Sequence, residues 1–70
     1  DEALREMKQP VLIVHGREDM IVPVDCSIAF HKVIPNSELH VFGNCGHWTQ
    51  IEMRERFVEV VLPFLHRAGV

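Results

Sequence analysis

The strongest constraint on how this chain folds comes from the apolar run Val11-Leu12-Ile13-Val14. Every residue in it is apolar and three are β-branched, so it lacks the polar alternation of a strand with one wet face. Such a run is typical of a strand covered on both faces, as in parallel sheets. Because helices must supply that cover, the run predicts an α/β protein.

The remaining sequence alternates between helical and extended patterns. Pro10 disfavours a helical residue before the first strand, and Pro63 is expected to kink the last helix near Glu59 to Pro63 or to end it early. In chain order, the predicted elements are a strand over 11–14, a helix over 24–34, a strand over 38–42 and a helix over 51–67.

Two strands joined by a helix usually lie parallel, with a right-handed crossover. The loops 16–23 and 43–49 then leave the sheet at its carboxyl edge, where catalytic groups of open α/β sheets gather. Asp19 and His47 would therefore meet although they are far apart in the sequence. We expect the carboxylate and the ring to lie within about 3.2 Å of each other.

The second of these loops carries a histidine that follows two glycines. Gly43 and Gly46 permit backbone conformations that other residues avoid, so the His47 ring can project from the strand end. Functional groups concentrate on such loops because a rigid scaffold aims them. This loop alone leaves open a solvent-exposed histidine with no chemical role.

A histidine that acts as a base works better with a carboxylate that fixes its tautomer. Asp19 suits that task, and the competing explanation is a turn aspartate that bonds its own backbone. Glu18 is expected to point the other way if the loop is extended, and Asp25 is better explained as a helix cap.

Composition excludes several classes of function. The net charge is −3 and no basic run is present, so no nucleic-acid binding is predicted. The longest apolar runs are too short to span a bilayer, so no membrane partner is predicted. Zinc ligands could be imagined at Cys26, His40, Cys45 and His47, but their spacings match no paired-ligand pattern. We therefore predict neither a metal nor a cofactor.

Both loops carry a resemblance to the α/β-hydrolases. The segment 11–23 follows their acid-loop pattern of apolar strand, His-Gly, two variable residues, Asp, two variable residues and Val-Pro. The segment Leu39 to Trp48 resembles their last strand and histidine loop. The resemblance implies the carboxyl-terminal β-α-β-α portion of an α/β-hydrolase fold with parallel strands. It also implies Asp19 as the triad acid and His47 as the triad base.

A narrower resemblance lies in Cys45-Gly46-His47-Trp48, followed by Gln50 and Glu52. This pattern is similar to the meta-cleavage product hydrolases, and most of all to 2-hydroxymuconic semialdehyde hydrolases. These enzymes split a carbon–carbon bond in 2-hydroxy-6-oxohexa-2,4-dienoates during bacterial aromatic degradation. The resemblance implies a small-molecule substrate, Trp48 as a pocket residue, and Cys45 as a small buried residue without a catalytic role.

Two departures from the family pattern qualify that resemblance. Met53-Arg54 stands where many relatives have His-Pro, which leaves the start of the last helix open. The chain also lacks Gly-x-Ser-x-Gly, since Ser27 falls in a helix and Ser37 in a turn. An esterase, another α/β-hydrolase activity and a non-catalytic binding fragment of the same fold remain the alternatives.

The absent nucleophile predicts that residues 1–70 form the carboxyl-terminal fragment of one domain. By family resemblance the whole enzyme would have about 270 residues, a size compatible with one large α/β domain. The expected partners are the remainder of that domain and the substrate, and a homo-oligomer is left open. Without a disulfide framework, the expected location is the cytoplasm.

Overall fold

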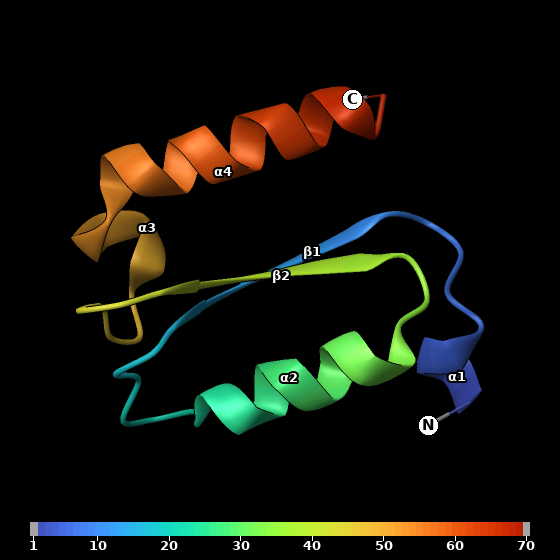
Figure 1. The fold of residues 1–70 in the computed structure, drawn as a ribbon, viewed down its shortest axis with the longest axis horizontal. Helices are drawn as coiled ribbons and strands as arrows, with labels where there is room; N and C mark the ends of the chain where they lie inside the picture. The colour runs from blue at the N-terminus through green and yellow to red at the C-terminus, as the bar shows by residue number, and fades with distance from the viewer. Residues whose placement is uncertain (1, 70) are drawn as a thin grey trace.

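The computed structural model describes residues 2–69, so Asp1 and Val70, the ends of the predicted 1–70 unit, lie outside the described residues. In chain order the elements are α1 (Glu2–Arg5), β1 (Val11–Gly16), α2 (Val24–Val33), β2 (Ser37–Phe42), α3 (Thr49–Glu52) and α4 (Arg54–Arg67). Figure 1 shows α2 and α4 on opposite sides of the strand pair. The predicted α/β class and the alternation of strand and helix are confirmed.

The two strands form a parallel pair, as predicted. Val11 lies opposite Ser37 and Gly16 lies opposite Phe42, so both strands end at the same level. Ser37 belongs to β2, and the turn predicted there ends one residue earlier. Because of this register, the loops that follow β1 and β2 begin side by side at the carboxyl edge of the sheet.

The helix α2 begins at Val24, as predicted, but Asp25 does not cap it. The N-cap position is Pro23, in an extended conformation, and no side chain caps the helix. Asp25 lies within the first turn, where a carboxylate still favours the positive end of the helix dipole. The assignment of Asp25 as a cap was therefore wrong, because this residue lies inside the first turn and Pro23 occupies the N-cap position.

The single helix predicted over 51–67 is two helices. Met53 has φ −127° and ψ 45°, which separates α3 from α4 at the place where the sequence departs from the family pattern that it resembles. The second helix continues through Pro63 to Arg67, so the predicted early end was wrong. Glu59, whose carbonyl loses its partner at Pro63, is exposed, and water can replace that bond.

The hydrophobic pattern of α4 is confirmed. Its five predicted core-facing residues are all half-buried, whereas the apolar residues Val58 and Leu62 on its other face are exposed. The confirmed core-facing residues are Phe57, Val60, Val61, Phe64 and Leu65.

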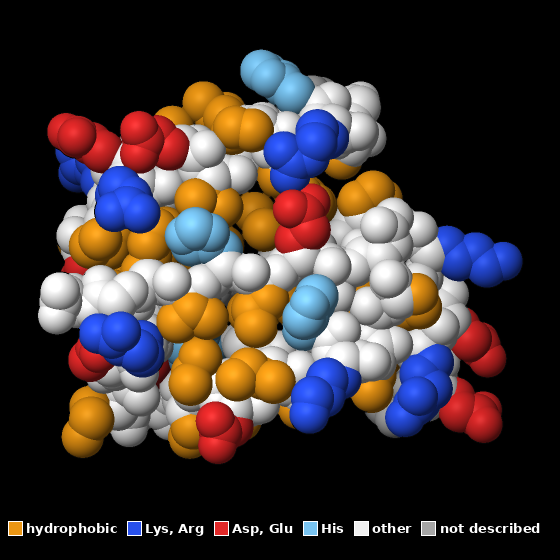
Figure 2. Space-filling model, viewed as in Figure 1, with side chains coloured by type: hydrophobic (Ala, Val, Ile, Leu, Met, Phe, Trp, Pro, Cys, Tyr) orange, Lys and Arg blue, Asp and Glu red, His pale blue; other side chains and the backbone are white. Residues whose placement is uncertain are grey.

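The core of the described residues is small. Only Ile34, Phe42 and Cys45 are buried hydrophobic residues, and the run 11–14, expected to be covered on both faces, is half-buried. The backbone is only 12 Å thick along its shortest axis because the sheet is two strands wide. Figure 2 accordingly shows hydrophobic side chains spread over the visible face. The exposed large ones are Met20, Ile21, Ile28, Phe30, Val41, Trp48, Ile51, Val58 and Leu62.

The close approach of the two loops requires a glycine at the end of β1. A Cβ at Gly16 would overlap the backbone of Cys45 and the carbonyl oxygen of Gly46. Two backbone hydrogen bonds stabilise this close approach. The N–H of Arg17 donates to the Phe42 carbonyl at 2.8 Å, and the N–H of Glu18 donates to the Cys45 carbonyl at 2.9 Å. Any side chain at Gly16 would therefore push the loops apart.

We predict that residues 1–70 in isolation do not fold stably. Two strands and their helices leave much apolar surface in water, and each strand has an open edge that invites pairing. Circular dichroism of the dilute, monomeric peptide should show no cooperative thermal transition. A sharp transition under those conditions would contradict this prediction.

We also predict that Gly16→Ala destabilises the longer hydrolase predicted from the sequence by about 3 kcal/mol, through overpacking against backbone that cannot move aside. Gly43→Ala is the matched control, since a Cβ there meets only the tip of the exposed Arg17 side chain. Urea denaturation measures both free energies of unfolding. Equal losses in the two variants would refute the role assigned to Gly16.

Candidate active site

The two loops at the carboxyl edge bring a carboxylate and an imidazole into contact. Asp19 lies on the loop between β1 and α2, and His47 lies on the loop between β2 and α3. The Nδ1 atom of His47 is 2.9 Å from Oδ2 of Asp19. The predicted hydrogen bond is therefore confirmed.

The carboxylate of Asp19 serves two structural purposes at once. Its Oδ1 accepts the backbone N–H groups of Ile21 at 2.8 Å and Val22 at 2.9 Å, which closes the turn of its own loop. Its Oδ2 is left for the His47 ring. The turn aspartate and the partner of the histidine, which were competing explanations, are both correct.

These contacts set the charge of Asp19. The N–H of Val22, the His47 ring and the N–H of Ile21 lower the pKa of this carboxyl to about 2, against the opposing effect of burial. Its side chain is only 5% exposed, so these bonds are shielded from water. Asp19 is consequently an anion at neutral pH.

An anionic Asp19 fixes the tautomer of the histidine. An ionised carboxylate only accepts hydrogen bonds, so Nδ1 of His47 carries the proton that is donated to Oδ2. The Nε2 atom is then the basic atom of the ring. The His47 side chain is 35% exposed, so groups beyond residues 2–69 can reach the ring.

His15 supports the acid loop, a role that the sequence analysis missed. Its buried ring has Nδ1 2.5 Å from the Ser27 hydroxyl and Nε2 2.7 Å from the Val22 carbonyl, so it ties β1 to the loop and to α2. Nε2 also lies 3.4 Å from Oδ2 of Asp19. The available signal was a polar residue closing an otherwise apolar strand. Ser27 lies within α2, as predicted, and its hydroxyl is committed to His15.

Glu18 does not point away from the histidine loop, contrary to expectation. Its Oε1 accepts the N–H of Cys45 at 3.0 Å, and its Oε2 accepts Nε–H of Arg17 at 2.6 Å. The Arg17 bond, followed by the Cys45 N–H, lowers the pKa of the Glu18 carboxyl. Glu18 thus contacts the backbone of the loop, whereas Asp19 contacts the ring.

The backbone of the histidine loop also differs in detail from the prediction. The left-handed residue is Asn44, at φ 53°, and neither Gly43 nor Gly46 has a positive φ. Asparagine tolerates this conformation better than most residues with a side chain. The glycines matter for space instead, since a Cβ at Gly46 would lie 3.2 Å from the Glu52 carboxylate.

The two neighbours of the histidine differ sharply in exposure. Trp48 is 56% exposed, and its ring meets the His47 ring edge-on, with centroids 5.2 Å apart. Cys45 is 1% exposed, which agrees with its prediction as a small buried residue. Burial, together with the charges of Glu52, Glu18 and Asp19, raises the pKa of the Cys45 thiol and keeps it protonated.

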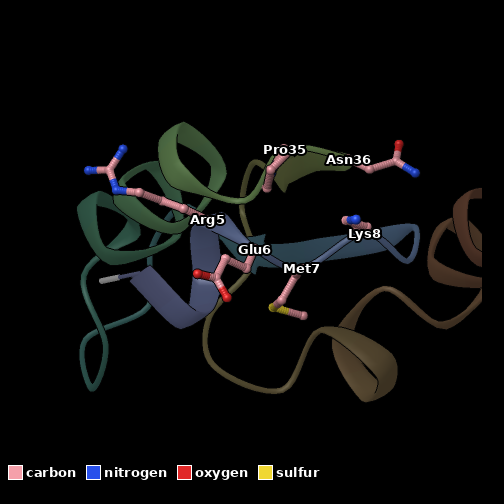
Figure 3. A pocket seen from close by; sticks show the side chains of 6 residues that line it. All are labelled: Arg5, Glu6, Met7, Lys8, Pro35 and Asn36. Carbon is pink, nitrogen blue, oxygen red and sulfur yellow. The ribbon is translucent and has the colours of Figure 1, made fainter.

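No other part of the described chain gathers similar groups. Residues 2–69 contain no group of three or more His, Cys, Asp or Glu side chains that could hold a metal ion. A hollow lies at the opposite edge of the sheet, and Figure 3 shows Arg5 and Asn36 pointing away from each other there. Its polar groups therefore do not converge on a common ligand. Its lining is Arg5, Glu6, Met7, Lys8, Pro35 and Asn36.

Among the helices of residues 2–69, none has both the length and the apolar composition needed to cross a membrane.

The lowered pKa of Asp19 predicts how stability depends on pH. Because the folded pKa of about 2 lies below the usual 3.8, ionised Asp19 stabilises the fold above about pH 4, and this is lost as pH falls toward 2. Urea unfolding of the longer hydrolase predicted from the sequence should show Asp19→Asn costing more stability at pH 6 than at pH 3. The control is Asp25→Asn, at an exposed carboxylate without a capping bond, and its cost should change less. A pH-independent cost for Asp19→Asn would contradict the assignment.

Comparisons with known proteins place these loops in a family. Residues 2–53 match the family model of the alpha/beta hydrolase fold. The chain is 51% identical over 65 residues to a 2-hydroxymuconate semialdehyde hydrolase of Pseudomonas putida, covering 93% of this chain and 23% of that protein. It is 43% identical over 65 residues to a 2-hydroxy-6-oxo-2,4-heptadienoate hydrolase of Pseudomonas putida F1, covering 93% of this chain and 24% of the relative.

Solved structures agree with these sequence matches. A mutant meta-cleavage product hydrolase from Pseudomonas fluorescens superimposes with a TM-score of 0.92 at 45% identity, over 96% of this chain and 25% of the other. A serine hydrolase involved in carbazole degradation gives 0.85 at 36% identity, over 90% and 24%. The chain spans about a quarter of the length of the relatives it matches. With this family match, and with strands, loops and register as described, the chain belongs to the α/β-hydrolase fold family.

Proposed function

We propose that this chain is the carboxyl-terminal part of a serine hydrolase and supplies the Asp19 and His47 of its catalytic triad. The observation that carries the proposal is the 2.9 Å bond between Nδ1 of His47 and an anionic Asp19, which leaves Nε2 as the base. A triad needs this arrangement, since the carboxylate orients the ring and stabilises the imidazolium. The serine and the oxyanion hole would come from the part of the enzyme that precedes these residues.

The proposed substrates are 2-hydroxy-6-oxohexa-2,4-dienoates, the products of aromatic ring cleavage. Support comes from the histidine-loop motif and from relatives named as hydrolases of 2-hydroxymuconate semialdehyde and 2-hydroxy-6-oxo-2,4-heptadienoate. Trp48 would line the pocket, because its exposed ring lies edge-on to His47. We further propose a cytoplasmic location, which suits the two free thiols at Cys26 and Cys45.

In the proposed mechanism, His47 moves protons between serine, substrate and water. Nε2 takes the proton of the serine hydroxyl as the serine oxygen attacks the 6-oxo carbonyl. The carbon–carbon bond beside that carbonyl then breaks, and its electrons must be accepted by the departing fragment. A keto form of the dienol provides that acceptor as an enolate, and the enolate then takes the proton held on Nε2. One base can thus serve both the tautomerisation and the cleavage. Water finally releases the acyl group from serine, again through Nε2.

Turnover of such a dienoate by the complete hydrolase tests the triad. Asp19→Asn keeps the shape of the side chain but frees the ring to take the wrong tautomer, which lowers turnover by about 10⁴-fold in a serine triad. His47→Ala should be at least as severe. Cys45→Ala should be mild, because the buried, protonated thiol only fills space.

The outcomes separate the alternatives. Near wild-type turnover by His47→Ala would refute the triad assignment. Inactivity of a folded Cys45→Ala variant would instead indicate that the thiol takes part in the reaction. A wild-type enzyme that hydrolyses simple esters but not the dienoate would refute the proposed substrate while leaving the triad intact. Absence of both activities would favour a non-catalytic member of the fold.

A further inference from the structure

Two carboxylates outside the proposed triad hold the backbone on either side of His47. The first is Glu52, at the end of α3. Its Oε1 accepts the N–H of Gly46 at 2.8 Å and its Oε2 accepts the N–H of Trp48 at 3.3 Å. These are the residues immediately before and after His47, so one side chain spans the peptide groups that carry the base.

The second carboxylate is Glu18, next to Asp19. Its side chain accepts the N–H of Cys45 at 3.0 Å, while its own N–H donates to the carbonyl of Cys45 at 2.9 Å. Cys45 is therefore held on both of its peptide groups by one residue of the acid loop. This fixes the spacing of the two loops independently of the bond between Asp19 and His47.

We propose that Glu18 and Glu52 are positioning residues that set the place of His47 for catalysis, an inference that rests on the function proposed above. We call the pair the carboxylate clamp. Asp19 fixes only the tautomer and the rotation of the ring, because it touches a single ring atom. The clamp fixes the backbone from which the ring projects, and a displacement of about 1 Å at a catalytic group can cost about 10²-fold in rate.

The clamp also explains the sequence of the loop. Gly46 leaves room for Glu52, since a Cβ there would stand 3.2 Å from Oε2. The break at Met53 ends α3 directly after Glu52, so the carboxylate belongs to a separate short turn beside the loop. The nearby glutamate Glu55 is exposed at the start of α4, and its side chain has no hydrogen bond or ion pair within residues 2–69.

The chemistry of the clamp predicts unequal tolerance of glutamine. Both oxygens of Glu52 accept a backbone N–H, whereas Glu18 uses only Oε1 for the loop and Oε2 for Arg17. A glutamine side chain has one acceptor oxygen, and an NH2 donor group takes the place of the second oxygen. Glu52→Gln must therefore set an amide donor against an N–H group, while Glu18→Gln can keep its bond to the loop.

Steady-state kinetics of the complete hydrolase with a 2-hydroxy-6-oxohexa-2,4-dienoate tests this. We expect Glu52→Gln to lower kcat by about 10- to 100-fold, with KM changed by less than about twofold, because the base is misplaced and binding is intact. Glu18→Ala should behave alike, and Glu18→Gln should stay within about threefold of wild type. The matched control Glu55→Gln removes the same charge and should leave kcat unchanged.

A double-mutant cycle separates positioning from general structural damage. In a His47→Ala background, Glu52→Gln should change the residual rate by less than about twofold, because its effect passes through the histidine. A full loss in that background, or wild-type kcat in Glu52→Gln alone, would overturn the proposal. If His47→Ala itself turned over normally, the proposed function would fail first, so the two failures are distinguishable.

Amide exchange in the unmutated hydrolase provides a readout that does not depend on folding of the variants. The N–H groups of Gly46 and Trp48 should exchange more slowly than that of His47, which lies between them, because Glu52 holds the first two. Exchange at Gly46 and Trp48 as fast as at His47 would overturn the clamp even if every variant failed to fold.

Discussion

The in-register parallel pairing of β1 and β2 is the constraint on which the site depends. Because Gly16 and Phe42 end their strands opposite each other, the acid loop and the histidine loop start from one level. The missing side chain at Gly16 lets the Gly46 carbonyl approach, and backbone bonds then continue between the loops. A register shift of one residue would separate the carboxylate from the ring and turn the side chains of a strand to the other face.

Asp19 shows how one short carboxylate can organise a site before any substrate arrives. Oδ1 holds the turn and Oδ2 holds the ring, so the acid is placed by its own backbone and the ring of the base is oriented by the acid. The buried ring of His15 also holds this loop, through a hydrogen bond to the carbonyl of Val22. Such preorganisation keeps the reorganisation needed during a reaction small.

The apolar surface of the chain agrees with the short span it covers in its relatives. A strand run without polar residues stays half-buried here, since the sheet is two strands wide. Large hydrophobic side chains on α2, α3 and α4 are exposed for the same reason. The chain spans about a quarter of the length of those relatives.

The sequence by itself determined the class of fold, the parallel order of the strands and the meeting of Asp19 with His47. Each follows from local patterns: an apolar run, a helical stripe, and two loops that must leave one edge of a parallel sheet. Tertiary structure alone decided where Glu18 and Glu52 point, which loop residue is left-handed, and what His15 binds. Side-chain hydrogen bonds between loops depend on distances of a few ångströms across the fold, and no periodicity in the sequence encodes them.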